Sequence, residues 1–288
     1  MEENFPTMFQ QEAKHVGVKE YVPPYLDQSL SIEELKTGVS FASAGTGIDP
    51  LTAQLSSVIS LSKQVEYFKE YQEKMEAAIG KEQTKKLIKE ALFIISIGSN
   101  DFIANYKLYP FRSQNYTVSA YIDFLLQHVH NFLKELLDQG ARKIAMAGLP
   151  PLGCLPSVIT LNSNDTFSKR DCIDSFSSIA RDYNPKLQNK LNGMQHSFAN
   201  LGSRIVYLEA YKPFMDIIQY KKLYGFEFVN IGCCGTGLIE FGLTCNHMSN
   251  ICPNASKYYW WDSVHPTEKA YYLISKALFP TIDSIIKN

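Results

Sequence analysis

Residues 92–101 read LFIISIGSND, an apolar run that ends in a glycine and a short polar turn. The run has the length and composition of a buried strand in a parallel sheet, where helices cover both faces. In such sheets the residues that follow each strand gather at the carboxyl edge, where open α/β proteins place their chemistry. The stretch therefore predicts an α/β fold, and Asn100 becomes a candidate functional residue.

Three further runs predict buried strands, and helical spacing fills the chain between them. The runs are residues 38–42 (GVSFA), 143–147 (KIAMA) and 204–208 (RIVYL). Apolar residues recur at three- and four-residue spacing in four segments, namely residues 51–88, 118–139, 168–200 and 266–279. Strands that alternate with helices predict a parallel sheet covered on both faces. No repeat or long linker divides the chain, so we expect one domain over residues 16–288, with residues 1–15 unassigned.

Composition excludes two classes of partner. The 28 basic and 29 acidic side chains of the 288 residues nearly cancel, and neither sign forms a long block. Nucleic acid is therefore not expected as a partner. No run approaches the roughly 18 apolar residues that a transmembrane helix needs, so no transmembrane segment is expected.

The cysteines indicate an oxidising compartment. Two local groups make up the six, Cys154 with Cys172, and Cys233, Cys234, Cys245 and Cys252. An even number in local groups is typical of disulfides in a secreted protein. Six cysteines allow fifteen connectivities, and pairing the first group would leave four for a C-terminal cluster. A zinc site that uses those four with His247 is the alternative, although adjacent cysteines lack the usual C-x-x-C spacing.

Three sequons, at Asn115, Asn164 and Asn254, lie in polar stretches and are glycosylation candidates. Together with the cysteines they predict secretion. Residues 1–17 (MEENFPTMFQQEAKHVG) nevertheless lack the basic start and apolar core of a signal peptide. We therefore expect that a segment belonging in front of this sequence is missing.

The chemistry is concentrated in residues 260–268, WWDSVHPTE. Asp262 and His265 share a tight turn in which the carboxylate can accept from Nδ1–H of the imidazole and leave Nε2 free to take a proton from a nucleophile. Pro266 suits the first turn of a following helix. The alternative is that Asp262 only caps this helix and His265 is a packed turn residue.

Two candidate hydrogen-bond donors follow other predicted strands. The side-chain amide of Asn100 can face a developing oxyanion, and Gly45 can bring a backbone N–H close because it has no side chain. The alternative is that both positions are ordinary turns.

The ordered combination of motifs resembles the plant GDSL esterase/lipase family of SGNH hydrolases, from about residue 16 to the end. The matching stretches are GVSFASAGTG (38–47), GSND (98–101), AGLPPLGCLP (147–156), CCGTG (233–237) and DSVHP (262–266). The resemblance implies a flavodoxin-like three-layer α/β/α sandwich, an extracellular location, no metal or organic cofactor, and ester hydrolysis through an acyl-enzyme. It assigns Asp262 and His265 to the catalytic dyad, and Gly45 and Asn100 to the oxyanion hole.

One family motif has no counterpart here. The Gly-Asp-Ser turn that supplies the nucleophilic serine in this family occurs nowhere in the sequence. Triad members act as a unit, so we expect weak or no esterase activity from this chain. Ser43, Ser99 and Ser263 lie near the motifs but are not expected to replace the nucleophile. A pseudoenzyme that binds a ligand without catalysis is the alternative function.

The missing motif also implies a missing first, central strand, between the strands expected at residues 38–42 and 92–97. Both neighbouring strands would then have an unpaired edge. The ester substrate is a lipid, an acetylated polysaccharide or a small ester, and the sequence does not choose among them. Aromatic residues at 22–26 and 258–261 are candidates for an apolar rim around it.

Overall fold

The computed structural model describes residues 8–163 and 169–287, which group into two compact units. The three-strand unit comprises Ala13–Gly148, Tyr183–Leu208 and the chain from Pro280 onward. The disulfide unit comprises Leu149–Asp182 and Glu209–Phe279, with the described residues up to Glu12. Each unit is described separately below.

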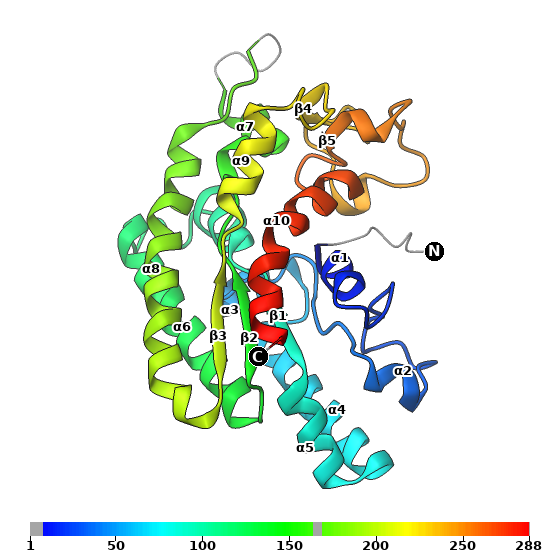
Figure 1. Ribbon diagram of the computed structural model, residues 1–288. Coiled ribbons are helices and arrows are strands. Elements are labelled where there is room, and N and C mark those ends of the chain that lie inside the picture. Colours follow the sequence, from blue (N-terminus) through cyan, green and yellow to red (C-terminus); the bar gives the residue numbers. More distant parts are fainter. Residues whose placement is uncertain (1–7, 164–168, 288) are drawn as a thin grey trace. The chain divides into compact units, whose positions relative to one another are not determined.

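A parallel sheet in the order β1-β2-β3 organises the three-strand unit (Figure 1). Its strands are β1 (Leu92–Ile95), β2 (Lys143–Ala147) and β3 (Arg204–Leu208), with the three first residues in register. The last two strands have the predicted bounds. The central strand β2 is buried from its second residue onward, as an inner parallel strand requires.

Two strand predictions need correction. β1 is shorter than predicted, and its four residues are half-buried because it pairs with β2 alone. The described chain therefore leaves one edge of β1 without a strand partner, and the missing central strand stays a prediction. Residues 38–42 form no strand. Only Ser40 makes an isolated bridge, to Pro24, in which Ser40 donates to the carbonyl of Pro23 and accepts from the N–H of Tyr25. The missing N–H of Pro23 prevents the ladder from continuing toward Gly38.

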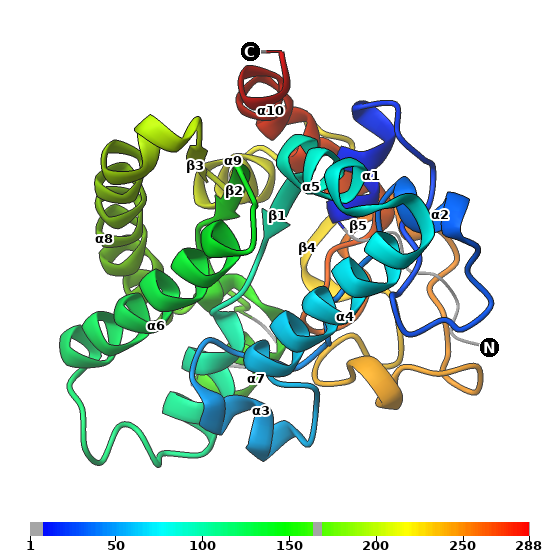
Figure 2. The same ribbon diagram turned by 90° about the horizontal axis from the view of Figure 1, so that it is seen from below.

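Helices flank this sheet (Figure 2). They are α2 (Ile32–Lys36), α3 (Pro50–Ser56), α4 (Leu61–Ile79), α5 (Lys81–Glu90) and α6 (Val118–Asp138), while α1 (Met8–His15) has residues in both units. The predicted helical stretch 51–88 is thus three helices, because Ser60 caps the start of α4 and Gly80, at φ 84°, separates α4 from α5. The rings of Phe68 on α4 and Phe93 on β1 pack 5.3 Å apart.

Two long helices have residues in both units, α8 (Asp174–Phe198) and α10 (Glu268–Ile286). In the three-strand unit, Lys186 of α8 pairs with Asp123 of α6 at 2.8 Å. The start of α10 corrects the prediction for Pro266, which bridges to Trp260 before the helix begins. The side chain of Thr267 caps the helix instead, accepting from the backbone N–H of Ala270 at 3.4 Å.

The disulfide unit contains a second parallel sheet that the sequence did not predict. Its strands are β4 (Phe228–Gly232) and β5 (Tyr258–Trp260), and its own helices are α7 (Pro156–Asn162) and α9 (Tyr211–Gln219). Tyr259 and Trp260 are fully buried and pack against Phe214 of α9. These two aromatic residues therefore form core, and their predicted place in a substrate rim is wrong.

All six cysteines form disulfides within the disulfide unit. The pairs are Cys154–Cys172, Cys233–Cys252 and Cys234–Cys245. Because the four C-terminal cysteines are paired, the thiolates that a zinc site would use are not present. The disulfide prediction is confirmed, and the zinc interpretation is wrong.

Several features of the chain as a whole stay predictions. They are the single domain over residues 16–288 and the flavodoxin-like three-layer arrangement. Within the described residues, no helix is long and apolar enough to cross a membrane.

Candidate active site

The turn between β5 and α10 brings Asp262 and His265 together. Oδ2 of Asp262 lies 2.8 Å from Nδ1 of His265. The other carboxylate oxygen accepts from the backbone N–H groups of Val264 and His265 at 2.8 and 2.7 Å. The turn closes with a 2.7 Å bond from the N–H of Trp261 to the carbonyl of His265. Two backbone N–H groups of a closed turn thus fix the carboxylate that orients the imidazole.

The two members of this pair differ in exposure. The side chain of Asp262 is 5% exposed and that of His265 is 51% exposed. Burial lowers the pKa of His265, but the hydrogen bond and the negative charge of Asp262 outweigh it and leave the pKa raised. The imidazole is consequently oriented at Nδ1 and more basic than a free histidine, as a general base requires.

The Cys233-Cys234 pair holds the strand that precedes this turn. The backbone N–H groups of both cysteines donate to the carbonyl of Trp261 at 2.8 Å. A Cβ on Gly232 would lie 2.7 Å from the carbonyl oxygen of Asp262, so only glycine permits this close approach. The disulfides of the two cysteines therefore fix the backbone on which Asp262 is built.

A second segment contacts the same turn from residues 240–242. The backbone N–H of Gly242 donates to Oδ2 of Asp262 at 3.4 Å, and the N–H of Ser263 donates to the carbonyl of Glu240 at 2.9 Å. Burial raises the pKa of Glu240, but hydrogen bonds from Thr236 and from backbone N–H groups lower it to about 2. Its ionised side chain keeps this segment folded beside the dyad.

The two candidate oxyanion donors lie in the three-strand unit, on adjacent loops. The side-chain amide of Asn100 donates to the carbonyl of Thr46 at 2.9 Å. An amide carries two hydrogens, so one remains for another acceptor. Gly45 has φ 84°, a conformation that favours glycine. Asn100 and the loop of Gly45 are thus in contact, while the dyad lies in the other unit.

Asp101, the residue after Asn100, holds the loop of Gly45. Its fully buried carboxylate accepts from the N–H groups of Ile48 and Asp49 at 2.8 and 2.9 Å and from the hydroxyl of Thr52 at 2.7 Å. A Cβ on Gly47 would clash with this carboxylate. Burial raises the pKa of Asp101 to about 7, against the effect of these hydrogen bonds.

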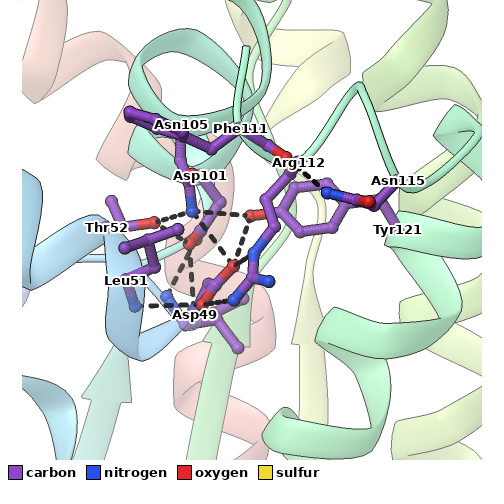
Figure 3. A network of polar contacts seen from close by, with 10 residues as sticks. Asp49, Leu51, Thr52, Asp101, Asn105, Phe111, Arg112, Asn115 and Tyr121 are labelled. Carbon is purple, nitrogen blue, oxygen red and sulfur yellow. Dashed lines mark hydrogen bonds and ion pairs between the residues drawn. The ribbon is translucent and has the colours of Figure 1, made fainter. Parts of the chain in front are cut away.

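Asp49 extends the network outward to a cation (Figure 3). Arg112 binds it through two N–H groups at 2.6 and 2.9 Å, and Tyr121 and Asn105 donate at 3.1 and 3.0 Å. Burial raises the pKa of Asp49, but these bonds and the charge of Arg112 outweigh it, so the pKa is lowered. The π-helical segment Asp101–Leu108 supplies Asp101 and Asn105 to this network.

A hollow of about 550 Å³ lies elsewhere on the three-strand unit. It is lined by charged residues of both signs and includes Lys143 and Arg204, the first residues of β2 and β3. It therefore opens at the amino ends of the strands, opposite to Asn100, and does not contain the candidate site.

Comparison with known proteins decides the family. Residues 5–278 match the family model described as GDSL-like Lipase/Acylhydrolase. The chain belongs to the GDSL esterase/lipase family. Among its Arabidopsis thaliana relatives, "GDSL esterase/lipase At5g45960" is 48% identical over 274 residues, which cover 95% of this chain and 73% of the relative. "GDSL esterase/lipase At2g40250" is 43% identical, covering 93% and 75%, and "GDSL esterase/lipase At2g04570" is 42% identical, covering 94% and 76%.

Members of the GDSL family are carboxylic-ester hydrolases, and the resemblance seen in the sequence is confirmed. The site contains residues to which sequence reasoning gave no role. These are Asp49, Asp101 and Arg112 beside the candidate donors of the three-strand unit, and Glu240 and Gly242 beside the dyad of the disulfide unit. Asp101 stands in the GSND motif, but Arg112 meets Asp49 across 63 positions of sequence, a separation that no local pattern reveals.

Two of the serines near the sequence motifs, Ser43 and Ser263, make contacts that stabilise the fold. Oγ of Ser43 accepts from the N–H of Ile59 at 3.3 Å. Ser263 is fully buried, and its backbone carbonyl accepts from both the N–H and the hydroxyl of Ser157 at 3.1 Å. Neither environment resembles that of an exposed nucleophile. That no serine of this chain replaces the one in the GDSL motif stays a prediction.

Two of the three sequons can be located. Asn115 and Asn254 are exposed, so a glycan would be sterically accessible at both. Asn164 lies outside the described residues.

Proposed function

We propose that Asp262 and His265 form the orienting acid and the general base of a GDSL-family ester hydrolase. The observation that carries this proposal is the 2.8 Å contact between Oδ2 of Asp262 and Nδ1 of His265, on a carboxylate that two backbone N–H groups also hold. If Asp262 only capped the following helix, it would need the contacts to backbone N–H groups but not the contact to the imidazole of His265.

The proposed reaction is acyl transfer. Nε2 of His265 takes the proton from a serine hydroxyl as that oxygen attacks the ester carbonyl, and Asp262 stabilises the resulting imidazolium. The proton then passes to the leaving alcohol. A water molecule, activated by the same base, hydrolyses the acyl-enzyme. We propose that Asn100 and the N–H of Gly45 donate to the oxyanion in both steps.

The activity expected of residues 1–288 depends on whether they contain a nucleophile. No Gly-Asp-Ser turn occurs in the sequence, so we propose that this chain hydrolyses esters weakly or not at all. The same observation favours a second function, that of a pseudoenzyme which binds an ester without turning it over. The substrate class under either function is a lipid, a polysaccharide acetyl ester or a small ester. The disulfides support secretion.

Hydrolysis of a short-chain p-nitrophenyl ester tests the proposal. We compare residues 1–288 with a chimaera that carries a Gly-Asp-Ser segment from a relative in front of residue 16. We expect activity in the chimaera and near-background rates in residues 1–288. The variant His265→Ala should reduce the activity of the chimaera by roughly 10³-fold or more.

His247→Ala is the matched control, because His247 is an exposed histidine of the same unit with no proposed role. Its activity should stay unchanged. An active chimaera that tolerates His265→Ala would contradict the role of the dyad. Activity of residues 1–288 that depends on His265 would show that another nucleophile serves it.

A further inference from the structure

We propose that the disulfide unit carries a docking surface for neutral lipid, formed by Ile239, Phe241, Leu243, Met248 and Ile251. We call it the apolar loop. The inference rests on the proposed function for its purpose, because a lipid surface bound here would present ester bonds to the dyad. The binding itself is independent of catalysis.

Exposure is the first observation. Leu243 is 96% exposed and Met248 is 80% exposed, while Ile239, Phe241 and Ile251 are each about half exposed, at 50–52%. Large apolar side chains this exposed are common singly, but several of them on one short, disulfide-closed segment favour a surface that binds something apolar. Here five fall within thirteen consecutive positions.

Covalent and hydrogen-bonded constraints hold the apolar loop in this state. The disulfides Cys233–Cys252 and Cys234–Cys245 close its ends and its middle. Phe241 and Thr244 exchange two hydrogen bonds, at 2.8 and 2.9 Å, across a short 3₁₀ turn. The apolar side chains are therefore displayed on a braced scaffold, which reduces the entropic cost of binding.

The charge of the segment favours neutral over anionic lipid as the partner. Residues 233–256 contain no lysine or arginine, and their only acidic residue is Glu240. The carboxylate of Glu240 accepts from the hydroxyl and the N–H of Thr236 at 2.7 and 3.1 Å, so it is satisfied within the loop. A surface without lysine or arginine gains nothing from anionic headgroups, and the one carboxylate, that of Glu240, keeps its hydrogen bonds to Thr236 when the surface enters an interface.

The apolar loop is hydrogen-bonded to the turn that carries Asp262 and His265. Gly242, between Phe241 and Leu243, donates to the carboxylate of Asp262, and the carbonyl of Glu240 accepts from Ser263. The apolar loop and the dyad thus share hydrogen bonds within one unit. A lipid surface bound to the loop would lie beside the half-exposed imidazole of His265.

Flotation with phosphatidylcholine vesicles tests the proposal, with the full disulfide-bonded chain. We expect binding that is unchanged by high salt and by added phosphatidylserine. The double variant Leu243→Ser/Met248→Ser should weaken the partition constant by about tenfold or more, because two large apolar side chains no longer enter the interface. The matched control is Leu161→Ser/Leu223→Ser, which removes two leucines that are 67% and 82% exposed in the same unit; it should bind as the unmodified chain does.

A Leu243→Trp variant gives a second readout, since its fluorescence should shift to shorter wavelength when vesicles are added. No vesicle binding, binding that needs anionic lipid, or equal losses in the two double variants would overturn the inference. So would a concentration-dependent dimer that Leu243→Ser/Met248→Ser abolishes without any vesicle binding. Absence of vesicle binding together with a catalytically active dyad would contradict only this inference and leave the proposed function standing. Vesicle binding together with an inactive dyad would contradict only the proposed function.

Discussion

The loop of the dyad and the loop of the oxyanion donors are stabilised by different physical means. Around Asp262, two disulfides fix the segments that contact the turn. Around Gly45, no cysteine is present, and the buried carboxylates of Asp101 and Asp49 hold the chain by accepting hydrogen bonds from its backbone and from Arg112. The first loop is therefore sensitive to redox conditions, and the second to the loss of a buried charge.

The largest effect is expected from breaking the buried network. Asp49→Ala leaves Arg112, Tyr121 and Asn105 without their shared acceptor, and removing one partner of a buried ion pair costs about 3–5 kcal/mol. We expect a decrease of that size in the free energy of unfolding, measured with urea. The control is Glu82→Ala, which removes an exposed partner of Lys85 and should change stability by less than about 1 kcal/mol. Similar values for the two variants would show that the network contributes little.

The next effect concerns the disulfide side of the comparison. The double variant Cys234→Ser/Cys245→Ser opens a loop with a sequence separation of 11, and the loss of a disulfide typically costs about 2–4 kcal/mol. Reduction with dithiothreitol should destabilise the unmodified chain at least as much. If thermal unfolding of the variant and of the unmodified chain coincides, the disulfide does not brace this loop.

Two carboxyl groups, one in each loop, should respond to pH in opposite directions. The pKa of Asp101 is raised to about 7, so the folded state keeps a proton that the unfolded state has already lost. Its contribution to stability is then lost as pH rises from about 4 to 7, with a slope of at most about 1.4 kcal/mol per pH unit. Asp101→Asn should reduce this slope. Glu12→Gln is the companion variant, because burial also raises the pKa of Glu12 to about 7.

A flat pH dependence of stability between pH 5 and 7 would instead mean that the three donors keep Asp101 ionised.

Glu240 provides the smaller, opposite effect, since its pKa is lowered to about 2. Its contribution is present above the unfolded pKa of about 4.5 and is lost as pH falls toward 2. Glu240→Gln should remove that part of the acid sensitivity, and an unaltered acid limb would contradict it.

The sequence predicted what depends on local pattern. β2 and β3 have the predicted bounds because each is a short run of residues suited to a parallel sheet, and β1 was located although its edge position makes it half-buried. Asp262 and His265 were paired because they lie three residues apart. The prediction of a strand at residues 38–42 was wrong, because this apolar run has no neighbouring strand beyond the single bridge to Pro24.

Long-range contacts were beyond prediction. The network of Asp49 depends on Arg112 and Tyr121, which approach only once α6 and the π-helical segment are in place. β4 and β5 pair across 30 positions between Phe228 and Tyr258. The polar Asn230 interrupts the apolar run of β4, and β5 has only three residues. Exposure of the apolar loop is equally invisible, since Leu243 and Met248 have the composition of core.

Titration of His265 by NMR tests the central claim most directly, because it needs no nucleophile. We predict a pKa above 6.5, with the proton of the neutral imidazole on Nδ1, and we predict that Asp262→Asn lowers that pKa. A neutral ring protonated on Nε2, or a pKa that Asp262→Asn leaves unchanged, would contradict the assignment of this pair as the base of the enzyme.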